Sequence, residues 1–146
     1  MSRAASLDDG TMSTGRDSDI DVVRGVYEAV GRGDFDAVVA ALDEDVEWIE
    51  PEGGPSGGTY RGPEAVVNKV FTELGDEWTE FAVEADRFVA VDGTVVALVT
   101  RRGSHAETGE RVEAPIADVW DLEDGTMTWF QHYVGSVRHA PSRGGR

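Results

Sequence analysis

The sequence contains no cysteine, so neither a disulfide nor thiol catalysis is available to this chain. It also has no apolar run near the ~20 residues that a membrane-spanning helix needs. Its first residues lack the basic-then-apolar pattern of a secretion signal. These absences predict a cytoplasmic protein that does not bind membranes.

Positive charge is also scarce. There are 13 Lys plus Arg against 29 Asp plus Glu, the net charge is -16, and Lys69 is the single lysine. Such a surface repels nucleic acid, because binding phosphates needs clustered cations. The acids are spread along a chain that is 40% hydrophobic, which is typical of a folded domain. We interpret the charge as a solvation device of a halophilic, salt-rich cytoplasm, where screening weakens self-repulsion.

Common metal and phosphate motifs are missing too. The sequence has no HxxxH or cysteine-based zinc pattern. Its glycine-rich stretch "EGGPSGG" lacks the lysine and the following helix start of a phosphate-binding loop. We therefore expect no metal and no other cofactor.

The chain length of 146 residues fits a single domain. Residues 1–17 are polar without periodicity and predict a flexible N-terminal arm, and residues 139–146 predict a flexible tail. Between them, residues 18–138 form the domain. Helical spacing predicts a first helix from Ser18, a second over "FDAVVAALDE", and a third that begins at Pro63.

The remaining elements have the period of strands. "DVEWIEP" predicts a short strand, followed by a loop over residues 52–62. Four further strands are predicted, joined by Gly-containing turns that favour hairpins, over residues 79–91, 94–102, 111–122 and 126–137. The result is an α+β domain with three N-terminal helices packed on the concave side of a strongly bent, mostly antiparallel sheet. Such a cone leaves a pocket for a small apolar molecule.

This order of elements resembles the cystatin-like, nuclear-transport-factor-2-like cone. "GDFDAVVAALDEDVEWIEP", "GTYRGPEAV" and "TGERVEAPIADVWDLEDG" resemble the ketosteroid isomerase and SnoaL-like polyketide cyclase branch of that superfamily. The superfamily includes isomerases, cyclases, epoxide hydrolases, dehydratases and binding proteins without catalysis. The resemblance therefore implies the fold and leaves the reaction open.

The resemblance also implies roles for particular residues. Glu50, in "WIEP", matches the general base of the isomerases, and Asp118, after "API", matches their protonated oxyanion donor. The oxyanion tyrosine matches Val26, with Tyr27 one residue away and about 100° round the helix. In the last strand, the position of His132 is apolar in isomerases and a catalytic Asp in epoxide hydrolases.

The cyclases that the chain resembles keep an acid/base Asp a few residues beyond that position. Here the place falls near Gly135. The last strand therefore lacks the catalytic carboxylate of both the epoxide hydrolases and the cyclases. His132 lies at or beside the position of that carboxylate.

Strand periodicity gives an independent argument for the pair Asp118–His132. Period two places His132 on the face of Phe130 and Asp118 on the face of Trp120. The hairpin between their strands puts Asp118 directly across from His132 or one diagonal step away. Such a pair is either a base with a fixed imidazole tautomer or a buried structural hydrogen bond. His132 faces either the pocket or water, since both strand faces hold aromatic residues.

Two further candidates depend on burial. Glu50 shares a strand face with Trp48, so partial desolvation would raise its pKa and fit it for proton transfer; the alternative is an exposed acid. Arg101 has the parity of Val99 and would bind a carboxylate or enolate in the pocket; the alternative at this strand end is surface exposure.

The sequence thus predicts a small cofactor-free enzyme that performs acid–base chemistry on an apolar, carbonyl-bearing molecule, by isomerisation, cyclisation, dehydration or hydrolysis. The expected catalytic residues are Glu50, Asp118 and His132, and the expected substrate-binding residues are Trp48, Trp120, Phe130, Tyr27 and Arg101. Alternatives are a non-catalytic small-molecule-binding cone and a dimerisation module. A homodimer is expected in either case, through an outer sheet face with Val119, Trp129 and Tyr133.

Overall fold

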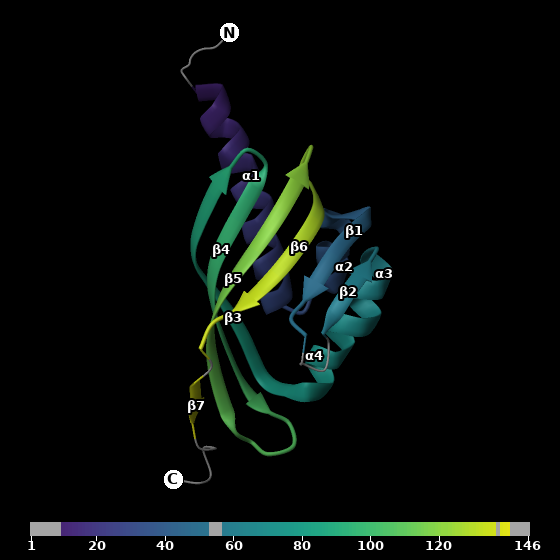
Figure 1. Cartoon of the computed structure of the whole chain (residues 1–146), viewed down its shortest axis with the longest axis vertical. Coiled ribbons are helices and arrows are strands. Elements are labelled where there is room, and N and C mark those ends of the chain that lie inside the picture. The colour runs from purple at the N-terminus through teal and green to yellow at the C-terminus, as the bar shows by residue number, and fades with distance from the viewer. Residues whose placement is uncertain (1–9, 53–56, 137, 141–146) are drawn as a thin grey trace.

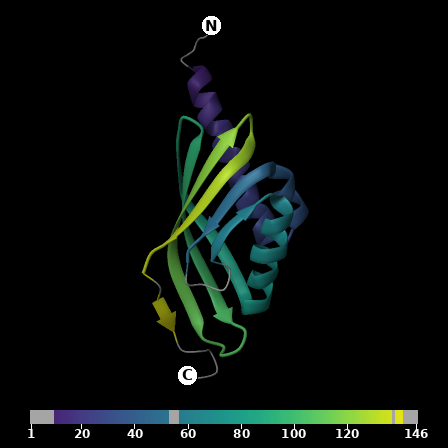
Figure 2. The ribbon, with the colours of Figure 1, turned by 45° about the vertical axis from the view of Figure 1, so that its right-hand side comes forward.

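Three helical segments cover one face of a single curved sheet (Figures 1 and 2). The structure, a computed structural model, describes residues 10–52, 57–136 and 138–140. Helix α1 (Gly10–Gly31) is followed by the short α2 (Phe35–Ala41). The third segment runs without a break through α3 (Pro63–Ala65), the π-helical η1 (Val66–Phe71) and α4 (Thr72–Glu77). The α+β architecture predicted from the sequence is confirmed.

The sheet has the strand order β2-β1-β6-β5-β4-β3, and a short seventh strand pairs with β5. Its strands are β1 (Leu42–Glu50), β2 (Gly58–Arg61), β3 (Trp78–Val91), β4 (Thr94–His105), β5 (Arg111–Glu123), β6 (Thr126–Val134) and β7 (Arg138–Ala140). All pairings are antiparallel except that of β1 with β6. That parallel pairing places the first long strand beside the last, as the views in Figures 1 and 2 show.

Two Asp-Gly turns set the hairpins of the sheet. Asp92 and Gly93 have φ of 51° and 82°, and Asp124 and Gly125 have φ of 51° and 79°. Two successive positive φ angles define the tight turn whose twist matches that of antiparallel strands. The turn at Asp124 therefore fixes how β5 meets β6, the two strands that carry Asp118 and His132.

Several boundaries differ from those predicted. Helix α1 begins at Gly10 instead of Ser18, so residues 10–17 are helical, whereas residues 1–9 lie outside the described part of the chain. The early turns of α1 project past the sheet in Figure 1, so no apolar periodicity marks them. Helix α2 ends at Ala41, because Leu42 is already extended and begins β1.

Two short strands were also missed. Strand β2 lies in the predicted loop, where its backbone pairs with β1 at the sheet edge despite its glycine-rich surroundings. Strand β7 pairs with β5 and overlaps the predicted tail, of which residues 141–146 lie outside the described part. Both are edge additions held by backbone hydrogen bonds, which leave little trace in side-chain patterns.

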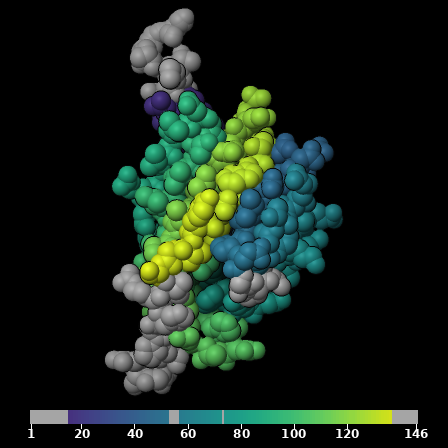
Figure 3. All heavy atoms as spheres, in the orientation of Figure 1, coloured from purple at the N-terminus to yellow at the C-terminus, as the bar shows by residue number. Residues whose placement is uncertain are grey.

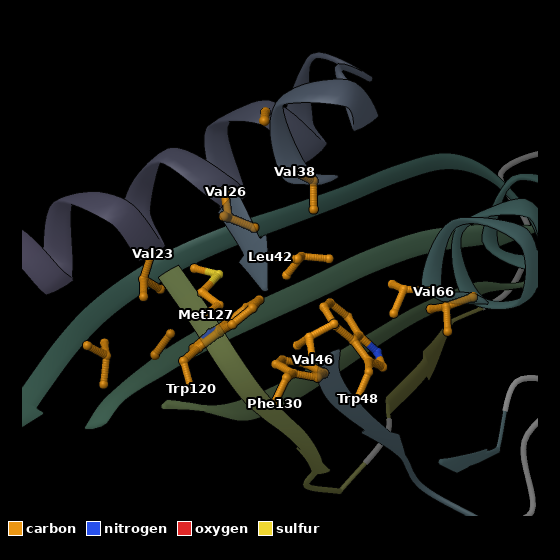
Figure 4. Close-up of a cluster of buried hydrophobic side chains, with 14 of the residues drawn as sticks. Val23, Val26, Val38, Leu42, Val46, Trp48, Val66, Trp120, Met127 and Phe130 are labelled. Atoms are coloured by element: carbon orange, nitrogen blue, oxygen red, sulfur yellow. The ribbon is translucent and has the colours of Figure 1, made fainter. Parts of the chain in front are cut away.

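The core fills the space between helices and sheet (Figure 4). Three aromatic side chains at its centre form a row across β1, β6 and β5: Trp48, Phe130 and Trp120, which are 4%, 2% and 1% exposed. Strand register aligns them, since Trp48 is opposite Phe130 and Phe130 is opposite Trp120. Their ring centroids are 3.9 to 5.6 Å apart. We call these three residues the aromatic row.

The opposite face of the sheet is open on this chain. Figure 3 views the molecule from that side, with β6 crossing it diagonally between β5 and β1. Tyr133 is 49% exposed there. The homodimer expected through this face remains a prediction. In the part of the chain that the structure describes, no helix is both long and apolar enough to cross a membrane.

Candidate active site

Three ionisable side chains lie two residues along from the aromatic row, on the same strands and the same face. On β5 and β6, Asp118 is directly opposite His132. On β1, Ile49 is opposite Gln131, so the next residue, Glu50, lies beside His132. Period two keeps all three on the face of the aromatic row. We call Glu50, His132 and Asp118 the titratable row.

A β-bulge in β6 brings this row together. Asp121 is opposite Trp129, whereas Leu122 is opposite Met127, so Thr128 is an extra residue on β6. Its hydroxyl donates a hydrogen bond to the Asp121 carbonyl at 3.3 Å. Without the bulge, counting from the turn would place Gln131 opposite Asp118. Bulges near functional sites commonly re-aim a side chain in this way.

Asp118 is the buried centre of a hydrogen-bonded chain. It is 4% exposed, and its Oδ1 lies 2.6 Å from Nδ1 of His132. Its Oδ2 accepts a hydrogen bond from the Tyr27 hydroxyl at 2.5 Å. The Tyr27 oxygen in turn accepts from Nε1 of Trp120 at 3.1 Å. A carboxylate buried this deeply needs such partners to offset its lost hydration.

The donor–acceptor order of these hydrogen bonds shows which nitrogen of His132 carries a proton toward Asp118. An indole N–H can only donate, so the Tyr27 hydroxyl must direct its own proton to Asp118. Asp118 thus accepts on Oδ2, and as a carboxylate it accepts on Oδ1 as well, which assigns the proton to Nδ1 of His132. When the ring is neutral, Nε2 carries a lone pair. This atom is buried and has no hydrogen-bond partner among the described residues.

The resemblance matched the oxyanion tyrosine of the isomerases to Val26, next to Tyr27. In the structure the hydroxyl of Tyr27 donates its hydrogen bond to Asp118. Both Val26 and Tyr27 line the cavity, but the hydroxyl of Tyr27 is engaged by Asp118. Burial raises the pKa of Tyr27 well above 10, and the charge of Asp118 and the hydrogen bond to it act in the same direction. Tyr27 therefore stays a hydrogen-bond donor throughout the neutral range.

Glu50 completes the row at the end of β1, just before Pro51. Its Oε2 accepts a hydrogen bond from Nε1 of Trp48 at 2.7 Å. Burial raises the pKa of Glu50, while the nearby His132 and the hydrogen bond from Trp48 partly oppose this rise. The structure thus buries Glu50 in part and excludes the alternative of an ordinary exposed acid.

The titratable row opens into a cavity of about 100 Å³ between the sheet and the helices. All eight residues predicted for the site line it, including Arg101 from β4, for which surface exposure was the alternative. The rest of the wall is apolar and includes Phe71, Leu74, Phe81, Val83, Val99 and Ile116. The two residues from β3 in this wall were not predicted, because periodicity marks a strand without showing that it bends over a pocket.

Position 135, near which the resemblance implies a carboxylate, has little room for a side chain. Its N–H donates to the Pro115 carbonyl at 2.8 Å. A Cβ at position 135 would lie 2.9 Å from Cγ of Pro115, closer than real side chains come. The carboxylates of this cavity therefore come from β1 and β5. Across the described residues, no group of three or more His, Cys, Asp or Glu side chains is placed to hold a metal ion.

A curved sheet with helices on its concave face and ionisable groups inside defines the nuclear-transport-factor-2-like (NTF2-like) cone. Within that class the chain belongs to the SnoaL-like domain family, whose model matches residues 23–130. It is similar to an NTF2-like protein of Burkholderia thailandensis E264, with 30% identity and a TM-score of 0.76 over 80% of this chain and 90% of that one.

More distant solved structures share the fold. TerC, co-crystallised with polyporic acid, is 20% identical with a TM-score of 0.73 over 81% of this chain and 92% of that one. A Mycobacterium tuberculosis LEH-like epoxide hydrolase is 21% identical with a TM-score of 0.69 over 83% of this chain and 85% of its own. No curated protein matches the sequence.

Proposed function

We propose that this chain is a small enzyme that removes a proton from the carbon beside a carbonyl group of an apolar molecule, with His132 as the base. The observation that carries this proposal is the buried Nε2 of His132. That atom has no partner among the described residues, although Nδ1 of the same ring is held by Asp118. A buried nitrogen lone pair beside an apolar cavity is placed to accept a proton from a ligand.

Each member of the site has a role in this step. Nε2 of His132 takes the proton, and the C–H electron pair moves into the carbonyl to form an enolate. Asp118 keeps the imidazole in the required tautomer and stabilises the imidazolium. Glu50 in its protonated form, which burial favours, donates a hydrogen bond to the enolate oxygen.

The fate of the enolate decides the overall reaction. Return of the proton to another carbon gives isomerisation, and loss of a hydroxyl from the next carbon gives dehydration. Attack of the enolate carbon on a second carbonyl gives cyclisation. All three begin with the same proton transfer, for which a positioned base contributes about 10² to 10⁴-fold, or about 3 to 5 kcal/mol.

The first step can be measured without knowing the substrate. Acetophenone and para-acetylbenzoate, two one-ring ketones, exchange their methyl protons for deuterium in deuterium oxide when a base acts on them. Proton NMR should show exchange with the wild-type protein that His132→Gln lowers by about 10² to 10⁴-fold. Gln retains an amide donor for Asp118, so the fold should persist.

The matched control is His105→Gln, since His105 does not line the cavity. Exchange should be unchanged in this variant. Exchange that is no faster than in buffer, although the ketones bind, would refute the enzyme and favour the non-catalytic binding cone. An equal loss of exchange in both histidine variants would show that His132 is not the base.

A further inference from the structure

We propose that Arg101 makes the cavity selective for anions, so that the substrate is a small apolar carboxylate with its reacting carbonyl at the other end. This inference rests on the proposed function for the reacting end of the molecule. For the anionic end it rests on Arg101 and its surroundings alone.

Arg101 and Arg102 are neighbours on β4 and point to opposite faces of the sheet. Arg102 is on the outside and pairs with Glu84 at 3.0 Å and with Glu113 at 2.8 Å. Arg101 lines the cavity, and within the described part of the chain no carboxylate forms an ion pair with it. The inner arginine thus lacks the partners that its neighbour has.

An unpaired guanidinium in a mostly apolar cavity is costly, because desolvation is not offset by a close opposite charge. Burial lowers the pKa of Arg101, and the charges of Glu50, Asp118 and Glu77 oppose this only in part. A bound carboxylate would supply the missing charge and accept two parallel N–H hydrogen bonds from the planar guanidinium.

The local packing places Arg101 beside Trp78. Its Cζ lies 6.0 Å from the centroid of the Trp78 ring, the limit of a cation–π contact. Gly103 makes room for that ring, since a Cβ there would lie 2.9 Å from Cε3 of Trp78. The ring therefore occupies the place of a side chain next to Arg101 on the same strand face.

Strand register separates Arg101 from the titratable row. Asp118 is opposite Ala97, so Arg101 is four residues further along β4, or about 13 Å of strand. The backbone of Arg101 is thus displaced along β4 from the strand position that faces Asp118. A ligand with one anionic end is then oriented along this direction, because Arg101 attracts its carboxylate and the carboxylate of Asp118 repels it. Its uncharged carbonyl end is then directed to His132.

A pair of probes isolates the charge. Para-acetylbenzoate and para-acetylbenzamide have the same ring and the same ketone and differ only in a carboxylate or a neutral amide. Titration followed by tryptophan fluorescence should show that the wild-type protein binds the acid about tenfold or more tightly than the amide, the range of a charge-assisted hydrogen bond. Arg101→Met keeps the apolar stem and should lose this preference, whereas the matched Arg102→Met should retain it.

Equal affinity for acid and amide in the wild-type protein would overturn the proposal, and this comparison needs no variant to fold. A preference that survives in a natively folded Arg101→Met would also overturn it, as would failure of both probes to bind. Binding requires no turnover. A protein that prefers the acid but catalyses no deuterium exchange would therefore refute the proposed function and leave the anion site standing.

Discussion

The aromatic row and the titratable row lie side by side on the same three strands, yet they contribute to the molecule in opposite ways. The aromatic row consists of large apolar side chains that are almost fully buried and in mutual contact. Burial of such side chains stabilises the fold by roughly 1.5 to 3 kcal/mol each. In the titratable row, burial works against the charged forms and is tolerated only with hydrogen-bonded partners.

The difference shows how one strand can serve two purposes. Moving two residues along β1, β5 or β6 exchanges a large apolar residue for an ionisable one that lines the cavity. Trp48 and Trp120 also connect the rows, since their indole N–H groups donate to Glu50 and, through Tyr27, to Asp118. The two tryptophans of the aromatic row therefore help to position Glu50 and Asp118 of the titratable row.

Truncation in the aromatic row should give the largest effect on stability. Trp120→Ala removes the most deeply buried ring and the donor to Tyr27, so we expect the free energy of unfolding to fall by about 3 to 5 kcal/mol. Urea denaturation measures this as a lower midpoint at an unchanged slope. His132→Gln, in the other row, should change the midpoint far less. If both variants lose stability equally, the two rows do not differ as described.

Tyr27→Phe tests the support that lies between the rows. The change removes one oxygen, leaving Oδ2 of Asp118 without its donor and Nε1 of Trp120 without its acceptor. We expect a loss of about 1 to 3 kcal/mol in the free energy of unfolding at neutral pH. Tyr133→Phe, on the exposed outer face of the sheet, provides the comparison. A Tyr27→Phe protein as stable as the wild type would show that Asp118 does not need this partner.

Glu50→Gln should have the smallest effect, with the opposite sign. Because the pKa of Glu50 is raised in the folded state, its contribution to stability is full below the unfolded pKa and is lost as pH rises through the folded pKa. Gln retains an acceptor for Trp48 and carries no charge. The variant should match the wild type near pH 4 and be slightly more stable than the wild type at pH 7. A variant that is less stable at pH 7 would contradict the raised pKa.

The sequence was sufficient for most of the fold and for much of the site. Period-two patterns and Asp-Gly turns identified the four long strands, because side-chain alternation follows directly from the pleat. Parity also placed Asp118 with Trp120 and His132 with Phe130, but it left open whether His132 and Arg101 face the pocket or water. The exact partner of Asp118 remained open, because a bulge at Thr128 has no signature in hydrophobic patterning.

Other features depended on tertiary context. Tyr27 lies next to the position that the resemblance indicated, and only the packing of α1 against the sheet brings its hydroxyl to Asp118. The edge strand β2 is held by backbone pairing, which needs no particular side chains. Among the described residues no carboxylate forms an ion pair with Arg101. This could not be read from a chain with 29 acids, since it depends on which acids face inward.

The parallel pairing of β1 with β6 has a consequence for how the molecule is made. The hydrogen bond between Tyr27 and Asp118 joins residues 91 positions apart in the sequence. Strand β1 pairs with β2 on one side, and its other neighbour, β6, comes much later in the chain. Such long-range closure slows folding. A nascent chain that has left the ribosome only as far as β5 still lacks His132 and one wall of the cavity. A ligand that fills the cavity would therefore bind only after β6 has been added, and its binding would stabilise the complete fold.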